Sequence, residues 1–217
     1  MKNILFLASG GGGNLKFIHR AIEKEIFPNI SLSLIADRDC EAIRYAKELE
    51  LDNHIISYSR SNPTSLQQLL HEKQPDFIVT NWHKIIDADT VRQYKGKFVN
   101  LHYSLLPAFA GLIGLEPIKR AYQQGCRYIG PTCHLVDEGV DTGKILAQAI
   151  FTTERSFDEA VTMMFRTGCL VLLNGLTILM SQNKVLQATD RPPSFSPILN
   201  YDSSSLDELF WQKVAKA

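Results

Sequence analysis

The chain has 217 residues, of which 45% are hydrophobic and 21% are charged, a length and composition that suit one globular domain with a large core. Its 23 basic and 23 acidic residues balance, whereas nucleic acid or an anionic membrane usually selects a basic excess. We therefore expect no nucleic acid and no membrane as a partner. A small molecule fits better, and a homodimer stays open.

The cysteines and the first residues bear on the cellular compartment. The four cysteines show no CxxC spacing and no short disulfide framework. No charged, apolar leader follows Met1. The longest apolar stretch, 169–180, falls short of the roughly 20 residues that cross a bilayer, and it is expected to be a buried helix. These features predict a cytoplasmic protein.

In the first half of the chain, predicted strands alternate with predicted helices. An apolar run at 3–8 leads into glycines at 10–13, after which Leu15, Ile18 and Ile22 recur with a helical period. Further strands are expected at 31–36, 54–57 and 76–80, and helices at 41–49 and 65–72. This alternation is typical of right-handed βαβ crossovers. It predicts an α/β fold with an open, mostly parallel, twisted sheet and helices on both faces.

The second half continues with a strand at 98–102 and a helix at 116–124. Two strands at 132–136 and 145–151 flank a loop, and a long helix at 157–180 closes the core. From residue 187 onward the composition changes to prolines and a serine run. We predict a catalytic domain at 1–186 and a Pro/Ser-rich C-terminal extension at 187–217.

The glycines at 10–13 form the first candidate ligand loop. Such residues adopt positive φ readily, so successive backbone N–H groups can converge on an anion at the start of the next helix. A phosphate is the ligand that such a loop favours. The loop lacks the Lys-Ser/Thr of a nucleotide-triphosphatase loop and the clean GxGxxG pattern of a dehydrogenase. Tight packing without a ligand is the alternative interpretation.

Asn100 and His102 stand at the end of the predicted strand 98–102. Positions two apart on a strand point to the same side, so an amide and an imidazole face one small volume. In open α/β sheets ligands bind beyond the carboxyl ends of strands. The pair suits stabilisation of a tetrahedral oxyanion and proton transfer. The alternative is structural, with Asn100 bonded to a turn and His102 buried in the core.

An acidic loop lies between the two later strands and carries Asp137, Glu138 and Asp141. Its spacing matches no EF-hand calcium loop, and a few carboxylates alone fix no coordination geometry, so no metal is predicted. For Asp141, an ordinary acidic turn residue is the alternative to a functional role. The remaining histidines, His134 among them, show no partner pattern and are assigned no chemistry.

Together these segments resemble the folate-dependent formyltransferases over roughly residues 2–180. The most specific part of the likeness is Asn-x-His-x-Ser-x-Leu-Pro followed downstream by Asp-x-Gly on a loop. It is matched here by Asn100, His102, Ser104, Leu106, Pro107, Asp141 and Gly143. The resemblance implies a Rossmann-like formyltransferase fold and an enzyme that moves a formyl group from 10-formyltetrahydrofolate to a primary amine. It implies no metal and no covalent enzyme intermediate.

The resemblance also implies roles for individual residues. Asn100, His102 and Asp141 become the catalytic trio, in which Asp141 is expected to hydrogen-bond His102 and to raise its pKa. The residues implied for donor binding are Trp82, His83, Lys84, Ile85, Ile86, Asp137, Glu138 and Val140, and those for an acceptor phosphate are Gly12, Gly13 and Asn14. Packing at a strand end is the alternative for Trp82 and His83.

Two departures from the family pattern bear on the acceptor amine. Family members that act on glycinamide ribonucleotide tend to have Pro after the catalytic His and an acidic residue in the late helix, where this chain has Tyr103 and, approximately, Gly168. A small phosphorylated amine like glycinamide ribonucleotide is the first expectation. Formylation of a nucleotide-linked amino sugar is one alternative, and hydrolysis of the donor is another. A non-catalytic folate-binding protein is a third class, and the length leaves little room for a tRNA-binding domain.

Overall fold

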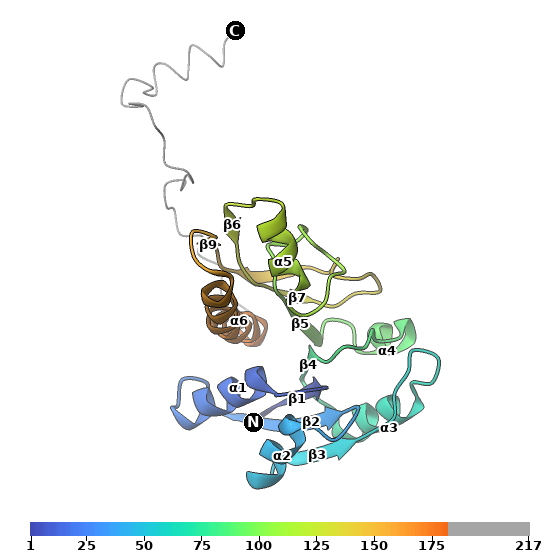
Figure 1. The fold of residues 1–217 in the computed structure, drawn as a ribbon. Coiled ribbons are helices and arrows are strands. Elements are labelled where there is room, and N and C mark those ends of the chain that lie inside the picture. Colours follow the sequence, from blue (N-terminus) through green and yellow to red (C-terminus); the bar gives the residue numbers. More distant parts are fainter. Residues whose placement is uncertain (182–217) are drawn as a thin grey trace, which may run out of the picture. The chain divides into compact units, whose positions relative to one another are not determined.

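The computed structural model describes residues 1–181 (Figure 1). The predicted boundary at 186 and the extension 187–217 lie outside the described residues, so that division stays a prediction. In chain order the elements are β1 (Lys2–Ala8), α1 (Gly13–Glu23), β2 (Ile30–Ala36), α2 (Glu41–Glu48), β3 (Asp52–Ile55), α3 (Thr64–Lys73), β4 (Phe77–Asn81), α4 (Ala88–Gln93), β5 (Phe98–His102), α5 (Glu116–Gln123), β6 (Tyr128–Ile129), β7 (Thr132–Leu135), β8 (Ile145–Gln148), β9 (Phe151–Thr152) and α6 (Phe157–Met180).

The main sheet has seven strands in the order β3-β2-β1-β4-β5-β7-β8. Neighbouring strands among β1 to β5 pair in parallel. The strand β7 then pairs antiparallel with β5, and β8 pairs antiparallel with β7. The predicted open and mostly parallel α/β sheet is therefore confirmed, with an antiparallel hairpin added at one edge.

Both faces of the sheet are covered, as the apolar run of β1 requires. Ile4, Phe6 and Ala8 point to one face and join a core with residues of α1, α2 and α6. Leu5 and Leu7 point to the other face, where they pack with residues of α3 and α4. Because side chains alternate along a strand, a continuous apolar run fills two cores at once. The prediction of helices on both faces is confirmed.

Three elements were not expected from the sequence. The helix α4 is six residues long and buries only Thr90 and Val91, so it shows no helical repeat. The strands β6 and β9 have two residues each and pair only with one another. The single strand predicted at 145–151 is wrong, since it divides into β8 and β9. A Cβ atom at Gly130 would lie 1.8 Å from the carbonyl oxygen of Ala149. The backbone between β8 and β9 therefore passes close to Gly130, and β9 then pairs with β6 outside the main sheet.

The long apolar helix α6 closes the core, as predicted. Its N-terminus has a capping box, in which Ser156 accepts from the backbone N–H of Glu159 while the Glu159 carboxylate accepts from that of Ser156. By length and composition alone this helix could cross a membrane. In the fold it packs on β7, β8, α1 and α5, as Figure 1 lets the reader follow. Its buried apolar residues therefore belong to the core, whereas Met163, Phe165 and Leu170 are exposed.

The packing of α6 on the sheet is tight enough to test. A Cβ atom at position 175 would lie 2.4 Å from Sγ of the fully buried Cys133. We expect Gly175→Val to lower the free energy of unfolding by about 1–3 kcal/mol, because the seam between α6 and β7 would be overpacked. Urea denaturation followed by circular dichroism measures this change.

The matched control is Asn174→Val, which places the same side chain at the preceding, exposed position of α6. It should leave the unfolding midpoint nearly unchanged. Equal midpoints for the two variants would contradict the close approach at Gly175.

Candidate active site

A cavity of about 280 Å³ opens beyond the carboxyl ends of β4 and β5. Ligand sites of open α/β sheets are found at this edge. Its walls are residues 80–86 after β4, residues 100–103 at the end of β5, residues 111–114, and residues 136–141 of the loop between β7 and β8. Asn14 at the start of α1 also lines it. Segments far apart in the sequence thus meet around one small volume.

Asn100, His102 and Asp141 come together on one side of this cavity. Nδ1 of His102 lies 3.2 Å from Oδ2 of Asp141. Nδ2 of Asn100 donates to Oδ1 of the same carboxylate at 3.4 Å. Since Asn100 and His102 are two positions apart on β5, their side chains reach Asp141 from the same side of the strand, as the sequence predicted. Their catalytic roles stay predictions, but their mutual contact is a feature of the fold.

The carboxylate of Asp141 is held by more than these two residues. The backbone N–H of Gly111 donates to Oδ2 at 2.8 Å, and Nε2 of His134 lies 3.5 Å from Oδ1. Burial acts to raise the pKa of Asp141, but His134, the Gly111 N–H and the charge of His102 outweigh it and hold the pKa below its usual value. Asp141 is therefore an anion at neutral pH despite being largely buried.

The loop that carries Asp141 depends on two unusual backbone positions. Asp141 itself has a φ of 57°, in the left-handed region that few non-glycine residues adopt. At Gly143 a Cβ atom would lie 1.8 Å from the carbonyl oxygen of Leu135. Only glycine permits this approach, which explains the glycine of the Asp-x-Gly motif in physical terms.

His102 is buried and has an oxygen acceptor near each ring nitrogen. Nε2 lies 3.1 Å from the carbonyl oxygen of Phe109, while Nδ1 faces Asp141. Burial lowers the pKa of His102 below its ordinary value, although Asp141 and the Phe109 carbonyl act in the opposite direction. Asp141 thus acts to raise the pKa of His102, as expected, but removal from water has the larger effect and the pKa is lowered overall.

His134 belongs to the site, although it shows no partner pattern in the sequence. Its Nδ1 lies 2.8 Å from the Leu135 carbonyl oxygen, and its Nε2 lies 3.2 Å from Nδ2 of Asn100. Thr80 donates to Oδ1 of Asn100 at 3.1 Å and fixes the other end of the amide. Strand register would have been needed to predict this contact from the sequence, because His134 is the antiparallel partner of Asn100.

The other residues of the Asn-x-His-x-Ser-x-Leu-Pro motif shape the loop beside His102. Ser104 is buried and its hydroxyl donates to the carbonyl of Ala108. Thr132 on β7 donates to the carbonyl of Ser104 at 2.7 Å and accepts from the N–H of Leu106 at 3.1 Å. These bonds hold the turn that brings the Phe109 carbonyl to His102.

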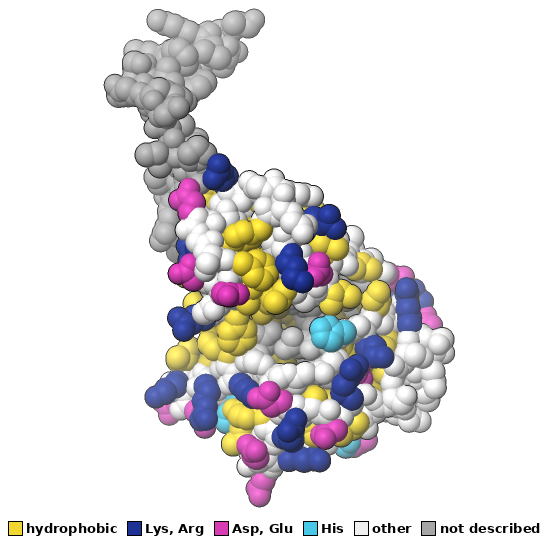
Figure 2. All heavy atoms as spheres, viewed as in Figure 1, with side chains coloured by type: hydrophobic (Ala, Val, Ile, Leu, Met, Phe, Trp, Pro, Cys, Tyr) yellow, Lys and Arg dark blue, Asp and Glu magenta, His cyan; other side chains and the backbone are white. Residues whose placement is uncertain are grey.

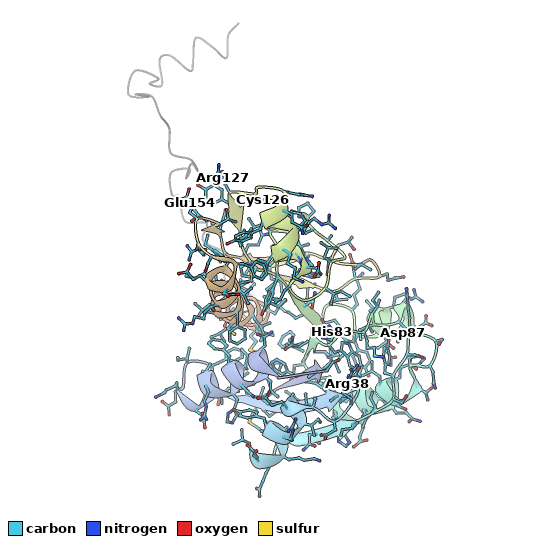
Figure 3. All side chains as sticks on the ribbon, in the orientation of Figure 1. Arg38, His83, Asp87, Cys126, Arg127 and Glu154 are labelled. Atoms are coloured by element: carbon cyan, nitrogen blue, oxygen red, sulfur yellow. The ribbon has the colours of Figure 1, made fainter. Side chains whose placement is uncertain are left out.

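All residues assigned to donor binding line the same cavity: Trp82, His83, Lys84, Ile85, Ile86, Asp137, Glu138 and Val140. An ion pair at 2.7 Å between Arg92 and Glu138 joins α4, the helix that follows residues 82–86, to the loop between β7 and β8. His83 and Ile85 are exposed, whereas Trp82 and Ile86 are buried. In Figure 3, His83 and Asp87 lie beyond the end of β4, near Arg38 from the residues after β2.

Asn14 lies in the cavity wall, whereas Gly12 and Gly13 are not among the residues that line the cavity. Gly12 has a φ of 67°, and its Cβ would lie 2.7 Å from Cβ of Ala42, so glycine is required there for packing alone. Sγ of Cys169 on α6 lies 3.5 Å from Oδ1 of Asn14. Phosphate binding at Gly12, Gly13 and Asn14 stays a prediction.

The surface around the cavity carries both signs of charge. Figure 2 shows Lys and Arg side chains interspersed with Asp and Glu, and hydrophobic side chains gathered over α5 and α6. The exposed apolar side chains of α6 include Met163, Phe165 and Leu170. This mixed pattern agrees with the balanced charge of the sequence and with a small-molecule ligand.

The fold and the site define an open α/β protein with a compact cluster of Asn, His and Asp beyond the carboxyl ends of its central strands. The sequence model of the formyl transferase family matches residues 2–167. The chain belongs to this family, and the resemblance expected from its motifs is confirmed.

The relatives include proteins named phosphoribosylglycinamide formyltransferase and proteins named formyltetrahydrofolate deformylase. The phosphoribosylglycinamide formyltransferase of Bacillus subtilis is 31% identical over 155 residues, which cover 68% of this chain and 78% of that protein. The chloroplastic protein of Vigna unguiculata is 30% identical over 158 residues, 69% of this chain and 51% of that protein. The chain thus spans about half the length of the first curated relatives that it matches. The crystal structure of the Bacillus halodurans protein has a TM-score of 0.74 at 28% identity, covering 85% of this chain and 98% of that one.

The electrostatic coupling of His102 to Asp141 gives a prediction that does not depend on any substrate. In Asp141→Asn the carboxylate that favours the imidazolium is gone, while burial remains. We therefore expect the pKa of His102 to fall further than in the unmodified protein. Titration of the His102 ring signals by NMR, assigned with a His102→Asn variant, measures it.

Asp137→Asn is the matched control, because Asp137 lies on the same loop and bonds Gly139 and Thr142 instead of His102. The pKa of His102 should be unchanged in that variant. A rise in the pKa of His102 in Asp141→Asn would contradict the contact between the two side chains.

Proposed function

We propose that the chain transfers the formyl group of 10-formyltetrahydrofolate to the primary amine of a small phosphorylated acceptor similar to phosphoribosylglycinamide. The observation that carries the proposal is the cluster of Asn100, His102 and Asp141 on the wall of a cavity at the carboxyl edge of the sheet. Family membership and the relatives named phosphoribosylglycinamide formyltransferase support it.

The residues of the cluster suit direct transfer of an acyl group. The acceptor nitrogen attacks the formyl carbon, a tetrahedral oxyanion forms, and the bond from that carbon to the donor nitrogen breaks. The Asn100 amide and an N–H of His102 are the groups placed to stabilise the oxyanion. The proton released by the amine passes to the leaving nitrogen, and Asp141 can relay it through a water. No metal and no covalent bond to the protein is needed.

The protonation states in the empty site fit these roles. Asp141 is ionised, because its pKa is lowered, and can accept a proton. His102 is largely neutral at neutral pH, because its pKa is lowered, and still donates one N–H. A negative charge that develops beside it during the reaction would favour the imidazolium form. The ring therefore gains stabilising power as the oxyanion forms.

The acceptor end of the cavity favours a second candidate, formylation of a nucleotide-linked amino sugar. A Cβ atom at Gly168 would lie 3.1 Å from Cδ2 of Leu101 and 3.3 Å from Cε1 of Tyr103. Position 168 therefore has little space for an acidic side chain, and Tyr103 occupies its surroundings. The two departures from the family pattern, Tyr103 and Gly168, are therefore consistent with an acceptor that needs no carboxylate at this position of α6.

The compartment proposed for this reaction is the cytoplasm. All four cysteines are in the described part of the chain, and all are free thiols. Burial raises the pKa of the Cys133 thiol to about 12 and that of Cys169 to about 11, so neither is a thiolate at neutral pH. Free, protonated thiols that take no part in redox chemistry are typical of a reducing compartment.

The experiment that tests the function follows the conversion of 10-formyltetrahydrofolate to tetrahydrofolate by absorbance. Phosphoribosylglycinamide and a panel of nucleotide-linked 3-amino and 4-amino sugars are supplied separately as acceptors. Turnover that requires an amine supports transfer, and the accepted amine names the substrate class. Turnover at the same rate without any amine would identify a hydrolase and refute the proposal.

Removal of either titratable group should abolish turnover without unfolding the protein. We expect His102→Asn and Asp141→Asn each to lower kcat by at least about 100-fold, since each loses a proton-transfer group. His71→Asn on α3 is the control and should keep normal kcat. A kcat close to normal in His102→Asn would return this residue to a purely structural role.

A further inference from the structure

One wall of the cavity is the 82–87 loop, which connects β4 to α4. In the described part of the chain, no backbone-to-backbone hydrogen bond is found for residues 83–86. The N–H of His83 reaches the hydroxyl of Ser9 at a long 3.4 Å. A loop held so weakly by its own backbone would sample several conformations, unless side chains from elsewhere fix it.

Tyr58 supplies these contacts from the segment after β3. Its hydroxyl donates to the carbonyl of Ile85 at 3.1 Å and accepts from the N–H of Asp87 at 2.9 Å. The same hydroxyl lies 3.4 Å from Oδ2 of Asp87. Oδ1 of Asp87 accepts from the N–H of Thr90 and caps α4. The buried hydroxyl of Tyr58 thus bonds Ile85 and Asp87, the residues on either side of Ile86 just before α4 begins.

The ring of Tyr58 fixes the beginning of the same loop. It stacks on the indole of Trp82, with ring centroids 5.0 Å apart and planes inclined by 27°. The indole Nε1 of Trp82 is buried and has no hydrogen-bond partner in the described part of the chain. The position of Trp82 is therefore set by stacking and packing. Tyr58 in this way contacts residues 82, 85 and 87 of one cavity wall.

The chemistry of these contacts requires a tyrosine. The hydroxyl accepts one hydrogen bond and donates another, which phenylalanine cannot do. Burial raises the pKa of Tyr58 to about 12, so the phenol keeps its proton throughout the neutral range. Tyr58 is not part of the cavity lining, so any effect on a ligand must pass through the loop.

We propose that Tyr58 is a positioning residue for the formyl donor, which it serves by fixing the 82–87 loop in the conformation that forms the cavity wall. The inference rests on the proposed function, since it takes the cavity wall to be the folate-binding wall. A wall fixed in advance has less conformational freedom to lose when the donor binds, and binding is tighter for that reason.

The test replaces Tyr58 by phenylalanine, which keeps the stack on Trp82 and removes the hydroxyl. Binding of 5-formyltetrahydrofolate, a stable isomer of the donor, is measured by titration calorimetry. We expect its Kd to rise about fivefold to tenfold, the effect of losing a buried hydrogen bond. With the reactive donor, KM for the donor should rise by a similar factor, while kcat and KM for the amine stay within about twofold.

The matched control is Tyr94→Phe. Tyr94 is buried in the same apolar cluster as Tyr58 and packs against Phe98, whereas the hydroxyl that bonds Ile85 and Asp87 is that of Tyr58. It should bind 5-formyltetrahydrofolate as the unmodified protein does. Asp87→Ala is the second variant, because it removes the cap of α4 and should weaken folate binding in the same direction as Tyr58→Phe.

The outcomes separate the inference from the proposed function. Unchanged Kd in Tyr58→Phe, or an equal loss in Tyr58→Phe and Tyr94→Phe, would overturn the positioning role while leaving the function intact. A loss of thermal stability with the donor KM unchanged would show a merely structural role and also overturn it. If the unmodified protein binds no folate at all, the proposed function fails and the inference fails with it.

Discussion

The buried carboxylate of Asp141 is the group on which the geometry of the site depends. A carboxylate removed from water is stable only with several partners, and here the partners come from β5, β7 and residue 111. Satisfying this one anion therefore fixes the ends of two strands and one loop relative to each other. The same contacts orient Asn100 and His102, so the stabilisation of the charge and the arrangement of the reactive groups are one structural requirement.

Asp141 reaches β5 because the loop that carries it folds back along the sheet. The strand β7 runs antiparallel to β5, from Thr132 opposite His102 to Leu135 opposite Val99, so it ends near the start of β5. The loop between β7 and β8 then returns toward the carboxyl end of β5, where Asp141 lies 3.2 Å from His102. The antiparallel pairing also places His134 opposite Asn100. The antiparallel hairpin is therefore the part of the fold that completes the site, while the parallel strands provide its base.

Much of the fold and of the candidate site could be predicted from the sequence, and physical causes explain the residues and elements that were not predicted. The alternation of strands and helices in β1 to β5 follows from local periodicity, as does the shared side of Asn100 and His102. His134 could not be assigned, because strand register is not a local property. The helix α4 was missed because six residues are too few to show a helical repeat. The contacts of Tyr58 just before this helix join residues 27 and 29 positions apart. Long-range contacts of single side chains leave no periodic pattern.

The two ends of the cavity are built from different kinds of structure, which has consequences for specificity. The reactive groups stand on strand ends and on a loop pinned by a buried charge, so little can change there without loss of the cluster. A second region lies where α6 contacts the glycine loop and β5, including the cavity-lining residues Asn14 and Tyr103. There a Cβ atom on Gly13 would meet Phe165, Cys169 lies near Asn14, and a Cβ atom on Gly168 would meet Tyr103. These are contacts between small or apolar groups that do not involve Asp141. Substitutions on α6 can therefore reshape the wall at Asn14 and Tyr103 while the contacts of Asp141 are kept.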